Sequence, residues 1–281
     1  TLRLAYERGV NFYDTAPVYG YGHSEEIIGK SLKSVRDKII IATKVGFLDH
    51  NVPQNFSPSY IRMSLEKSLR RLDTEYVDLY QLHSPLLEIL RKEKGVMECL
   101  NSLKNEGKIK TFGISVRSPE DAIIAVTEFG FKIVQVNFNM IDQRILENHF
   151  VDFALENNIS IIARTPFCFG FLTGRYSGTK FDLRDHRSSW GEAQLEKWAE
   201  SPNFFAFLNV GKKRSLAQLA LQFCIAPPSV ATVIPGMMKE EEVKENIIAG
   251  ELPPLTAYEL EKIREVYRNH SFFIQAKTIT K

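Results

Sequence analysis

The chain alternates short runs of β-branched and apolar residues with helical patterns, and this alternation constrains the fold more than any other feature. Strand-like runs occur at residues 10–13, 39–44, 77–82, 111–115, 133–137, 159–163 and 231–234. Strands that alternate with helices indicate a parallel sheet with helical crossovers. Several runs are apolar throughout, as expected for strands covered on both faces.

Helix start and stop signals lie between these runs. Serine caps helices, proline suits the first helical turn, and glycine commonly follows the last turn. The predicted helix starts are Ser24, Ser57-Pro58, Ser118-Pro119 and the pair Thr256 and Glu259, which has capping-box spacing. Other helical patterns cover residues 1–8, 148–156, 216–225 and 239–248, and one contains Val96, Leu100 and Leu103 and ends before Gly107.

These elements predict an α/β fold, a (β/α)8 TIM barrel whose first strand is apparently missing from the N-terminus. Seven strands are one short of a closed barrel, and the chain begins with Thr1 rather than methionine, so we expect the eighth strand before residue 1. A doubly wound open sheet is the competing architecture, but its GxGxxG turn after the first strand is not found. We expect residues 1–281 to form a single barrel domain.

Composition excludes several classes of protein. A formal net charge of +2, evenly spread, does not suggest nucleic acid or an anionic membrane as a partner. No apolar run approaches the roughly 18 residues of a membrane span, and no secretory signal is present. The cysteines are odd in number and far apart, so we expect reduced thiols, no metal site and a cytoplasmic location. They are Cys99, Cys168 and Cys224.

Four polar residues lie at the ends of three successive predicted strands. Asp14 ends the first run, Tyr19 follows it in a loop, Lys44 ends the second run and His83 ends the third. Taken singly, each would more often be a turn acid, a packing tyrosine, a solvated lysine or a loop histidine. The active site of a barrel lies at the carboxyl ends of its strands, so together they predict a catalytic group.

These residue types suit the reduction of a carbonyl. A tyrosine has a pKa near 10, a nearby ammonium lowers that value, and a carboxylate holds the ammonium in place. Tyr19 is therefore the predicted general acid, with Asp14 and Lys44 as a relay behind it. His83 is expected to donate a hydrogen bond to the substrate oxygen. No side chain supplies a hydride, which points to a nicotinamide cofactor.

The motifs around these residues resemble the aldo-keto reductase superfamily. Asp14-Thr15-Ala16 with Tyr19-Gly20, then Ala42-Thr43-Lys44, then residues 78–83 follow the order of that superfamily's catalytic tetrad. Further matching motifs are Gly29-Lys30, residues 68–72, residues 107–110, Gly113-Ile114-Ser115, residues 170–175, residues 234–236 and Glu245-Asn246. The resemblance therefore covers nearly the whole chain.

The resemblance implies a barrel that binds NADP, with NAD possible, without a Rossmann fold. By position, Ser115 and Gln135 resemble the residues that hold the nicotinamide carboxamide. The segment that wraps the pyrophosphate corresponds to Arg164, Thr165, Pro166, Phe167, Cys168, Gly170 and Arg175. The residues in the place of the adenosine contacts are Gly236, Met238, Glu242, Glu245 and Asn246.

Three positions depart from the family pattern. Val116 stands where many members have asparagine, and Arg164 stands where an aromatic residue commonly stacks on the nicotinamide. Many NADP-specific members have lysine and arginine where this chain has Gly236 and Glu242. A carboxylate there would repel a 2′-phosphate, although Lys239 could offset it, so NADP is only the family default.

The predicted function is NAD(P)H-dependent reduction of an aldehyde or ketone, with a small carbonyl compound as the substrate. One alternative is a cofactor-binding regulatory subunit, although the channel-associated members carry a different residue at the position of His83. Another is an aldolase with a Schiff base on Lys44. The long insertion between residues 163 and 231 is expected to be a binding loop or lid. Candidate pocket walls are Phe47, Leu48, Trp190 and Phe272-Phe273.

Overall fold

A computed structural model describes residues 1–47, 49, 52–183, 185–211 and 214–274 and contains all seven predicted strands. They form one parallel sheet in which each strand pairs with the next along the chain. The strands are β1 (Phe12–Asp14), β2 (Ile40–Val45), β3 (Val77–His83), β4 (Ile109–Ser115), β5 (Ile133–Asn137), β6 (Ser160–Arg164) and β7 (Val230–Ile234). This confirms the expected α/β order.

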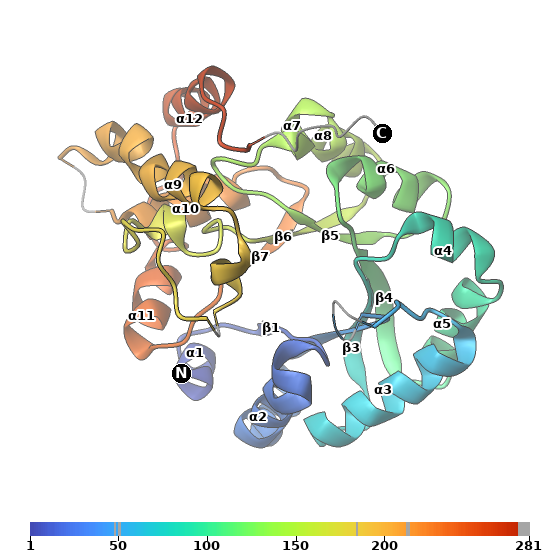
Figure 1. Ribbon diagram of the computed structural model, residues 1–281. Coiled ribbons are helices and arrows are strands. Elements are labelled where there is room, and N and C mark those ends of the chain that lie inside the picture. The colour runs from blue at the N-terminus through green and yellow to red at the C-terminus, as the bar shows by residue number, and fades with distance from the viewer. Residues whose placement is uncertain (48, 50–51, 184, 212–213, 275–281) are drawn as a thin grey trace.

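The sheet curls into a nearly closed barrel. The two edge strands, β1 and β7, approach each other, and the helices form a ring around the strands (Figure 1). The barrel fold is therefore confirmed. The eighth strand was expected before residue 1 and stays a prediction.

The predicted helices are present, with small shifts at their ends. The helices of the described residues are α1 (Leu2–Glu7), α2 (His23–Leu32), α3 (Pro58–Leu72), α4 (Leu87–Lys92), α5 (Val96–Asn105), α6 (Pro119–Thr127), α7 (Arg144–Glu147), α8 (Phe150–Glu156), α9 (Glu192–Glu200), α10 (Leu216–Ile225), α11 (Glu240–Ile248) and α12 (Ala257–Asn269). Of these, α4, α7 and α9 were not predicted from the sequence. The capping box of Thr256 and Glu259 is confirmed, and the Ser118 hydroxyl accepts from the amide of Asp121. Among the described residues, none of the helices is both long and apolar enough to cross a membrane.

The helix start predicted at Ser24 is wrong. A 3-10 turn, Tyr19–Gly22, runs directly into α2, and Gly22 in the left-handed region (φ 97°) is the cap. The Ser24 hydroxyl instead accepts a hydrogen bond of 2.9 Å from the hydroxyl of Thr15, which anchors α2 to the loop after β1.

The barrel interior has two layers of different chemistry. The lower layer is an apolar cluster of Phe12, Ala42, Leu79, Ile133, Ile162 and Ile234. Successive side chains of a strand point to opposite faces, so the inward neighbour of each residue lies two positions along. In five strands that neighbour, one layer nearer the carboxyl end, is polar: Asp14, Lys44, Gln81, Gln135 and Arg164. We call these five residues the polar layer.

The described residues of the insertion between β6 and β7 form three 3-10 helices, α9 and α10, and they include an aromatic cluster. The ring of Phe169 lies 4.4 Å from that of Trp190, which lies 5.2 Å from that of Trp198. The side-chain amide of Gln194 in α9 bonds the carbonyl of Phe272 and the amide of Ile274, so the chain after α12 is fixed to the insertion.

Candidate functional site

Asp14 and Lys44 form a buried ion pair in the polar layer. Asp14 is the last residue of β1, and Lys44 is the inward residue of the neighbouring strand β2. The Lys44 Nζ donates to the Asp14 carboxylate and, over 2.9 Å, to the carbonyl of Thr15. Lys44 is fully buried, so its ammonium is surrounded by oxygen acceptors rather than water.

Tyr19 and His83 complete the predicted tetrad at the same end of the barrel. Tyr19 opens the 3-10 turn after β1, and its side chain is 43% exposed. The Lys44 Nζ lies 5.1 Å from the centre of the Tyr19 ring, and the His83 ring lies edge-on at 6.1 Å. The structure thus brings all four residues together, with the phenol facing solvent and the ion pair beneath it. Phe47, a candidate pocket wall, lies 5.4 Å from the His83 ring, whereas Leu48 lies outside the described residues.

His83 is a neutral imidazole in this site. Burial lowers the pKa of His83 to about 2, and the positive charges of Lys44 and Arg164 act in the same direction. Its Nδ1 atom is buried and has no hydrogen-bond partner within the described part of the chain. A neutral imidazole carries one N–H, so His83 can donate a single hydrogen bond to an oxygen without transferring a charge.

The neutral state of His83 predicts a pH dependence of stability. Between the folded pKa of about 2 and the unfolded value of 6.5, only the unfolded chain binds this proton, so stability falls as the pH drops below 6.5. From pH 7 to pH 5, His83→Gln should therefore lose about 2 kcal/mol less unfolding free energy than the wild type. Urea denaturation at both pH values measures the difference. The exposed His23→Gln serves as a control, and an equal loss in the wild type and His83→Gln would contradict the assignment.

Two glutamines of the polar layer also hold Asp14. The side-chain amides of Gln81 and Gln135 donate to Asp14 Oδ1 over 3.0 and 2.9 Å. The sequence predicts Gln135 only as a residue that holds the nicotinamide carboxamide, and it predicts no role for Gln81. A signal was present, since Gln81 is a polar residue two positions before His83 and therefore on the same inward face of β3.

The two residues predicted to hold the nicotinamide carboxamide are neighbours. Ser115 and Gln135 pair in the β4–β5 register, and the Ser115 hydroxyl donates to Gln135 Oε1 over 3.2 Å. Arg164, also predicted for this region, donates from Nη2 to the carbonyl of Val116 over 2.8 Å. Burial lowers the pKa of the Arg164 guanidinium, and its Nε–H finds no partner among the described residues. A polar ligand group would satisfy this N–H, which fits a bound cofactor.

The loop after β6, predicted to wrap the pyrophosphate, is tightly wound. Three of its residues other than glycine have positive φ angles, a costly conformation that clusters at ligand sites: Thr165 (55°), Cys168 (43°) and Phe169 (56°). Pro166, Phe167 and Cys168 are buried, and burial raises the pKa of the Cys168 thiol. The amides of Cys168, Gly170 and Phe171 donate to carbonyls of the loop itself. These three amides are therefore already paired within the loop.

Arg175 is bound by two carboxylates of α11. Its guanidinium donates to Glu242 over 3.1 Å and also to Glu245. The second oxygen of Glu242 accepts from the amides of Met238 and Lys239 over 2.7 and 3.2 Å, which occupies two amide groups directly before α11. Ion pairs therefore join α11 to the loop that follows β6.

The other residues predicted for the adenosine half lie around this link. Gly236 and Met238 are exposed between β7 and α11. Asn246 is only 8% exposed, and its Nδ2 has no hydrogen-bond partner in the described part of the chain. This buried donor, like that of Arg164, is compatible with a polar ligand nearby.

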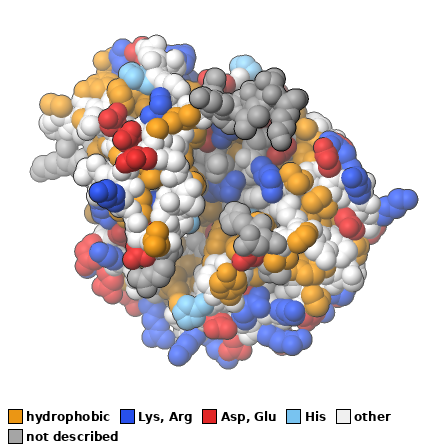
Figure 2. Space-filling model, viewed as in Figure 1, with side chains coloured by type: hydrophobic (Ala, Val, Ile, Leu, Met, Phe, Trp, Pro, Cys, Tyr) orange, Lys and Arg blue, Asp and Glu red, His pale blue; other side chains and the backbone are white. Residues whose placement is uncertain are grey.

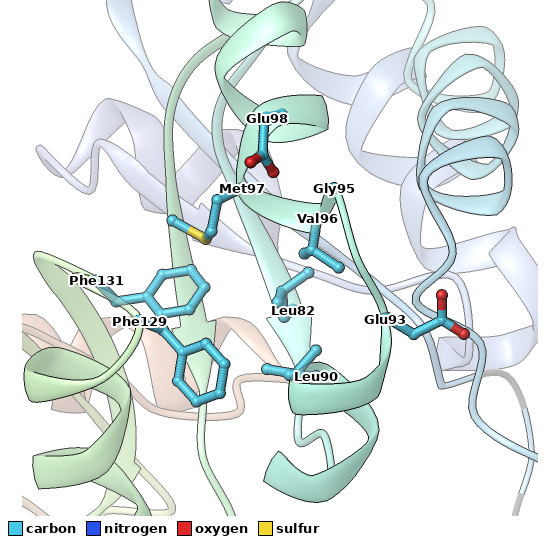
Figure 3. A pocket seen from close by; sticks show the side chains of 9 residues that line it. All are labelled: Leu82, Leu90, Glu93, Gly95, Val96, Met97, Glu98, Phe129 and Phe131. Carbon is cyan, nitrogen blue, oxygen red and sulfur yellow. The ribbon is translucent and has the colours of Figure 1, made fainter.

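The face drawn in Figure 2 is hollowed near its centre, inside the ring of helices, and Lys or Arg side chains lie beside the hollow. A separate cavity of about 200 Å³ lies between α4, α5 and the residues before β5. Its walls include Leu82, Leu90, Met97, Phe129 and Phe131 (Figure 3). Leu82 alternates with the inward residues Gln81 and His83 along β3, so this cavity lies outside the barrel and apart from the tetrad.

Comparison with known proteins gives one consistent family. The model of the aldo/keto reductase family matches residues 1–268. An uncharacterised oxidoreductase of Bacillus subtilis (strain 168), YqkF, is 32% identical over 96% of this chain and 89% of its own length. The NADH-specific methylglyoxal reductase of Escherichia coli (strain K12) is 28% identical over 89% of this chain and 81% of its own.

A solved structure agrees with these relatives. The holo form of aldo-keto reductase AKR11C1 from Bacillus halodurans superposes with a TM-score of 0.76 and 31% identity, covering 94% of this chain and 85% of the other. Both the barrel and the sequence therefore match the same group of proteins. The chain belongs to the aldo/keto reductase family, whose members are NAD(P)-dependent oxidoreductases.

Proposed function

We propose that this protein reduces an aldehyde or ketone to an alcohol, with Tyr19 as the proton donor. The observation that carries the proposal is the buried Asp14–Lys44 ion pair, which lies directly behind a half-exposed phenol and a neutral imidazole. These are the groups that a proton transfer to a carbonyl oxygen requires, at the catalytic end of the barrel.

Each residue of the tetrad has a separate task in this reaction. The reduced nicotinamide, when bound, supplies the hydride to the carbonyl carbon. The N–H of His83 donates to the carbonyl oxygen and orients it, and Tyr19 donates its hydroxyl proton to that oxygen as the negative charge develops. The Lys44 ammonium stabilises the phenolate that remains, and Asp14 keeps the ammonium in place.

Residues of three segments would hold the cofactor. Ser115 and Gln135 would bind the carboxamide, and the unpaired N–H of Arg164 would lie near the same group. Arg175 would contact the pyrophosphate after exchanging one of its carboxylate partners. Asn246 would bind the adenosine half through its unpaired amide.

We further propose that NADH serves this enzyme at least as well as NADPH. Two carboxylates neutralise Arg175, and the first turn of α11 contains three consecutive glutamates, residues 240–242. A 2′-phosphate at this helix start would meet net negative charge and an amide pair already occupied by Glu242. One relative of this chain is named an NADH-specific reductase.

Cofactor consumption with a panel of aldehydes and ketones tests both proposals. We expect turnover, with a kcat/KM for NADH equal to or above that for NADPH. Removing one unfavourable charge, in Glu242→Gln, should shift the NADPH/NADH ratio of kcat/KM toward NADPH by about tenfold, the equivalent of 1.4 kcal/mol. Glu241→Gln makes the same charge change at an exposed neighbour and should leave the ratio nearly unchanged.

Other outcomes of this assay would contradict the proposals separately. A wild-type preference for NADPH of tenfold or more would refute the cofactor proposal. Cofactor binding, seen by fluorescence quenching, without turnover of any carbonyl would favour the regulatory subunit. Borohydride trapping of substrate on Lys44 would favour the aldolase, although the burial of Lys44 against Asp14 makes it a poor nucleophile. The cytoplasmic location stays a prediction from the cysteine pattern.

A further inference from the structure

Gln81 is a buried polar residue in the centre of the barrel that the tetrad does not include. It lies on β3 between the inward residues Leu79 and His83, and it is fully buried. A primary amide in such a place costs free energy unless its donors and acceptor are paired. Its contacts therefore indicate why an amide occupies this position.

Among the described residues, the side-chain hydrogen bonds of Gln81 lead to Asp14 and to Gln135 of the predicted nicotinamide site. Its Nε2 donates to Asp14 Oδ1 over 3.0 Å, and its Oε1 accepts from Gln135 Nε2 over 3.3 Å. Gln135 also donates to Asp14 Oδ1, over 2.9 Å. The three side chains form a closed triangle of hydrogen bonds. We call Asp14, Gln81 and Gln135 the triangle.

The triangle fixes the orientation of the Asp14 carboxylate toward the lysine. Oδ1 of Asp14 accepts from both glutamines, and Oδ2 accepts from Lys44. Rotation of the carboxylate would break both amide contacts, so Asp14 is fixed in the orientation that holds the ammonium behind Tyr19. The amide of Gln81 is fixed as well, because its oxygen would face the carboxylate if the amide were reversed.

The triangle also reaches the residues predicted to bind the nicotinamide. Both Nε2 hydrogens of Gln135 point into the triangle, whereas its Oε1 accepts from the Ser115 hydroxyl over 3.2 Å. A ligand group that bonds Ser115 or Gln135 would therefore act on an amide that itself donates to Asp14. A continuous series of hydrogen bonds leads from Ser115 to the Lys44 ammonium.

We propose that Gln81 is a positioning residue for the proton transfer: it holds Asp14 against Lys44 and fixes Gln135, which donates to the same carboxylate. This inference rests on the proposed carbonyl reduction. Gln81 touches none of the reacting atoms and acts through Asp14. Losing it should affect the chemical step rather than the binding of the carbonyl.

The first test is Gln81→Met, which keeps the size of the side chain and removes both polar groups. We expect kcat to fall by about 10- to 100-fold, as for a small displacement of a catalytic group, with the carbonyl KM and the cofactor Kd within about twofold of the wild type. The pH at which turnover is half-maximal on the alkaline side should also shift. Gln222→Met, which removes a buried glutamine far from the site, is the matched control.

A double-mutant cycle separates positioning from a general structural role. If Gln81 acts through Asp14, the variant with both Gln81→Met and Asp14→Asn should have the kcat of Asp14→Asn alone within about twofold. Losses that multiply, or a Gln81→Met variant with wild-type kcat and pH profile, would overturn the proposal. If Gln81→Met does not fold, Gln81→Glu tests the donor instead. Its turnover should rise as the pH is lowered and the new carboxyl gains a donor proton, and a pH-independent loss would count against the proposal.

A measurement without cofactor keeps this inference distinct from the proposed function. Urea unfolding of the wild type, Gln81→Met, Asp14→Asn and the double variant gives the coupling between the two residues in the cofactor-free protein. We expect the losses of unfolding free energy in the two single variants not to add up in the double variant. Additive losses would show that the two side chains do not interact, and would overturn the proposal. If the cycle shows coupling but the wild type reduces no carbonyl, the proposed function fails while the triangle stands.

Discussion

Replacing Tyr19 with phenylalanine is expected to lower kcat by about 10²- to 10⁴-fold, the range that general acid catalysis contributes. The hydroxyl is the only group removed, and the 43% exposed ring keeps its place beside His83 and above Lys44. Cofactor affinity should stay unchanged because Ser115 and Gln135 are untouched. Steady-state turnover and fluorescence quenching by NADH measure the two quantities.

A neighbouring tyrosine provides the control for this variant. Tyr21 lies two residues further in the same 3-10 turn, is 83% exposed, and donates to Asp49 over 3.2 Å. Tyr21→Phe removes the same hydroxyl from the same loop and should retain nearly all activity. Turnover of Tyr19→Phe at the wild-type rate would remove Tyr19 as the acid, and loss of cofactor binding would assign it to the binding site instead.

Asp14→Asn is expected to cost both stability and turnover. Without the carboxylate, the fully buried Lys44 ammonium loses its counter-ion, and breaking a buried pair in this way costs about 3–5 kcal/mol. Turnover should fall because the relay behind Tyr19 loses its charge. Urea unfolding gives the stability loss, and single-turnover reduction under conditions where the variant is folded gives the rate.

A surface pair of the same type shows what burial contributes. Lys33 and Asp73 also form a lysine–aspartate ion pair, but both side chains are 60% or more exposed. Asp73→Asn should cost at most about 1 kcal/mol, as is usual for exposed pairs. Similar losses for the two variants would show that the Asp14–Lys44 pair has no special role in the fold.

The alternation of strands and helices and the proximity of the four predicted tetrad residues were predictable from the sequence because both depend on local patterns. A strand of parallel sheet has a recognisable composition, and the residue at its carboxyl end necessarily lies at the catalytic face. Asp14, Lys44 and His83 each occupy such a position, so three strand ends were enough to place them together.

The contacts between distant segments were not predictable in the same way. The Gln81–Asp14 bond joins residues 67 positions apart, and the Arg175–Glu245 pair joins residues 70 positions apart. Pairs of this kind depend on the curvature of the whole barrel, which no local pattern records. The cap of α2 was mispredicted for a related reason, because the Ser24 hydroxyl bonds Thr15 in another segment. The individual cofactor contacts stay predictions.

The two layers of the barrel interior give the two sides of the Asp14–Lys44 pair different surroundings. The apolar cluster that includes Phe12, Leu79 and Ile162 lies beneath the polar layer, so the Asp14–Lys44 pair borders apolar side chains on that side. Moving water or a proton through this cluster costs free energy, because none of its side chains is polar and could bind them. In the proposed reaction, we therefore expect the proton that leaves Tyr19 to be replaced from the carboxyl end of the barrel, where its ring is exposed.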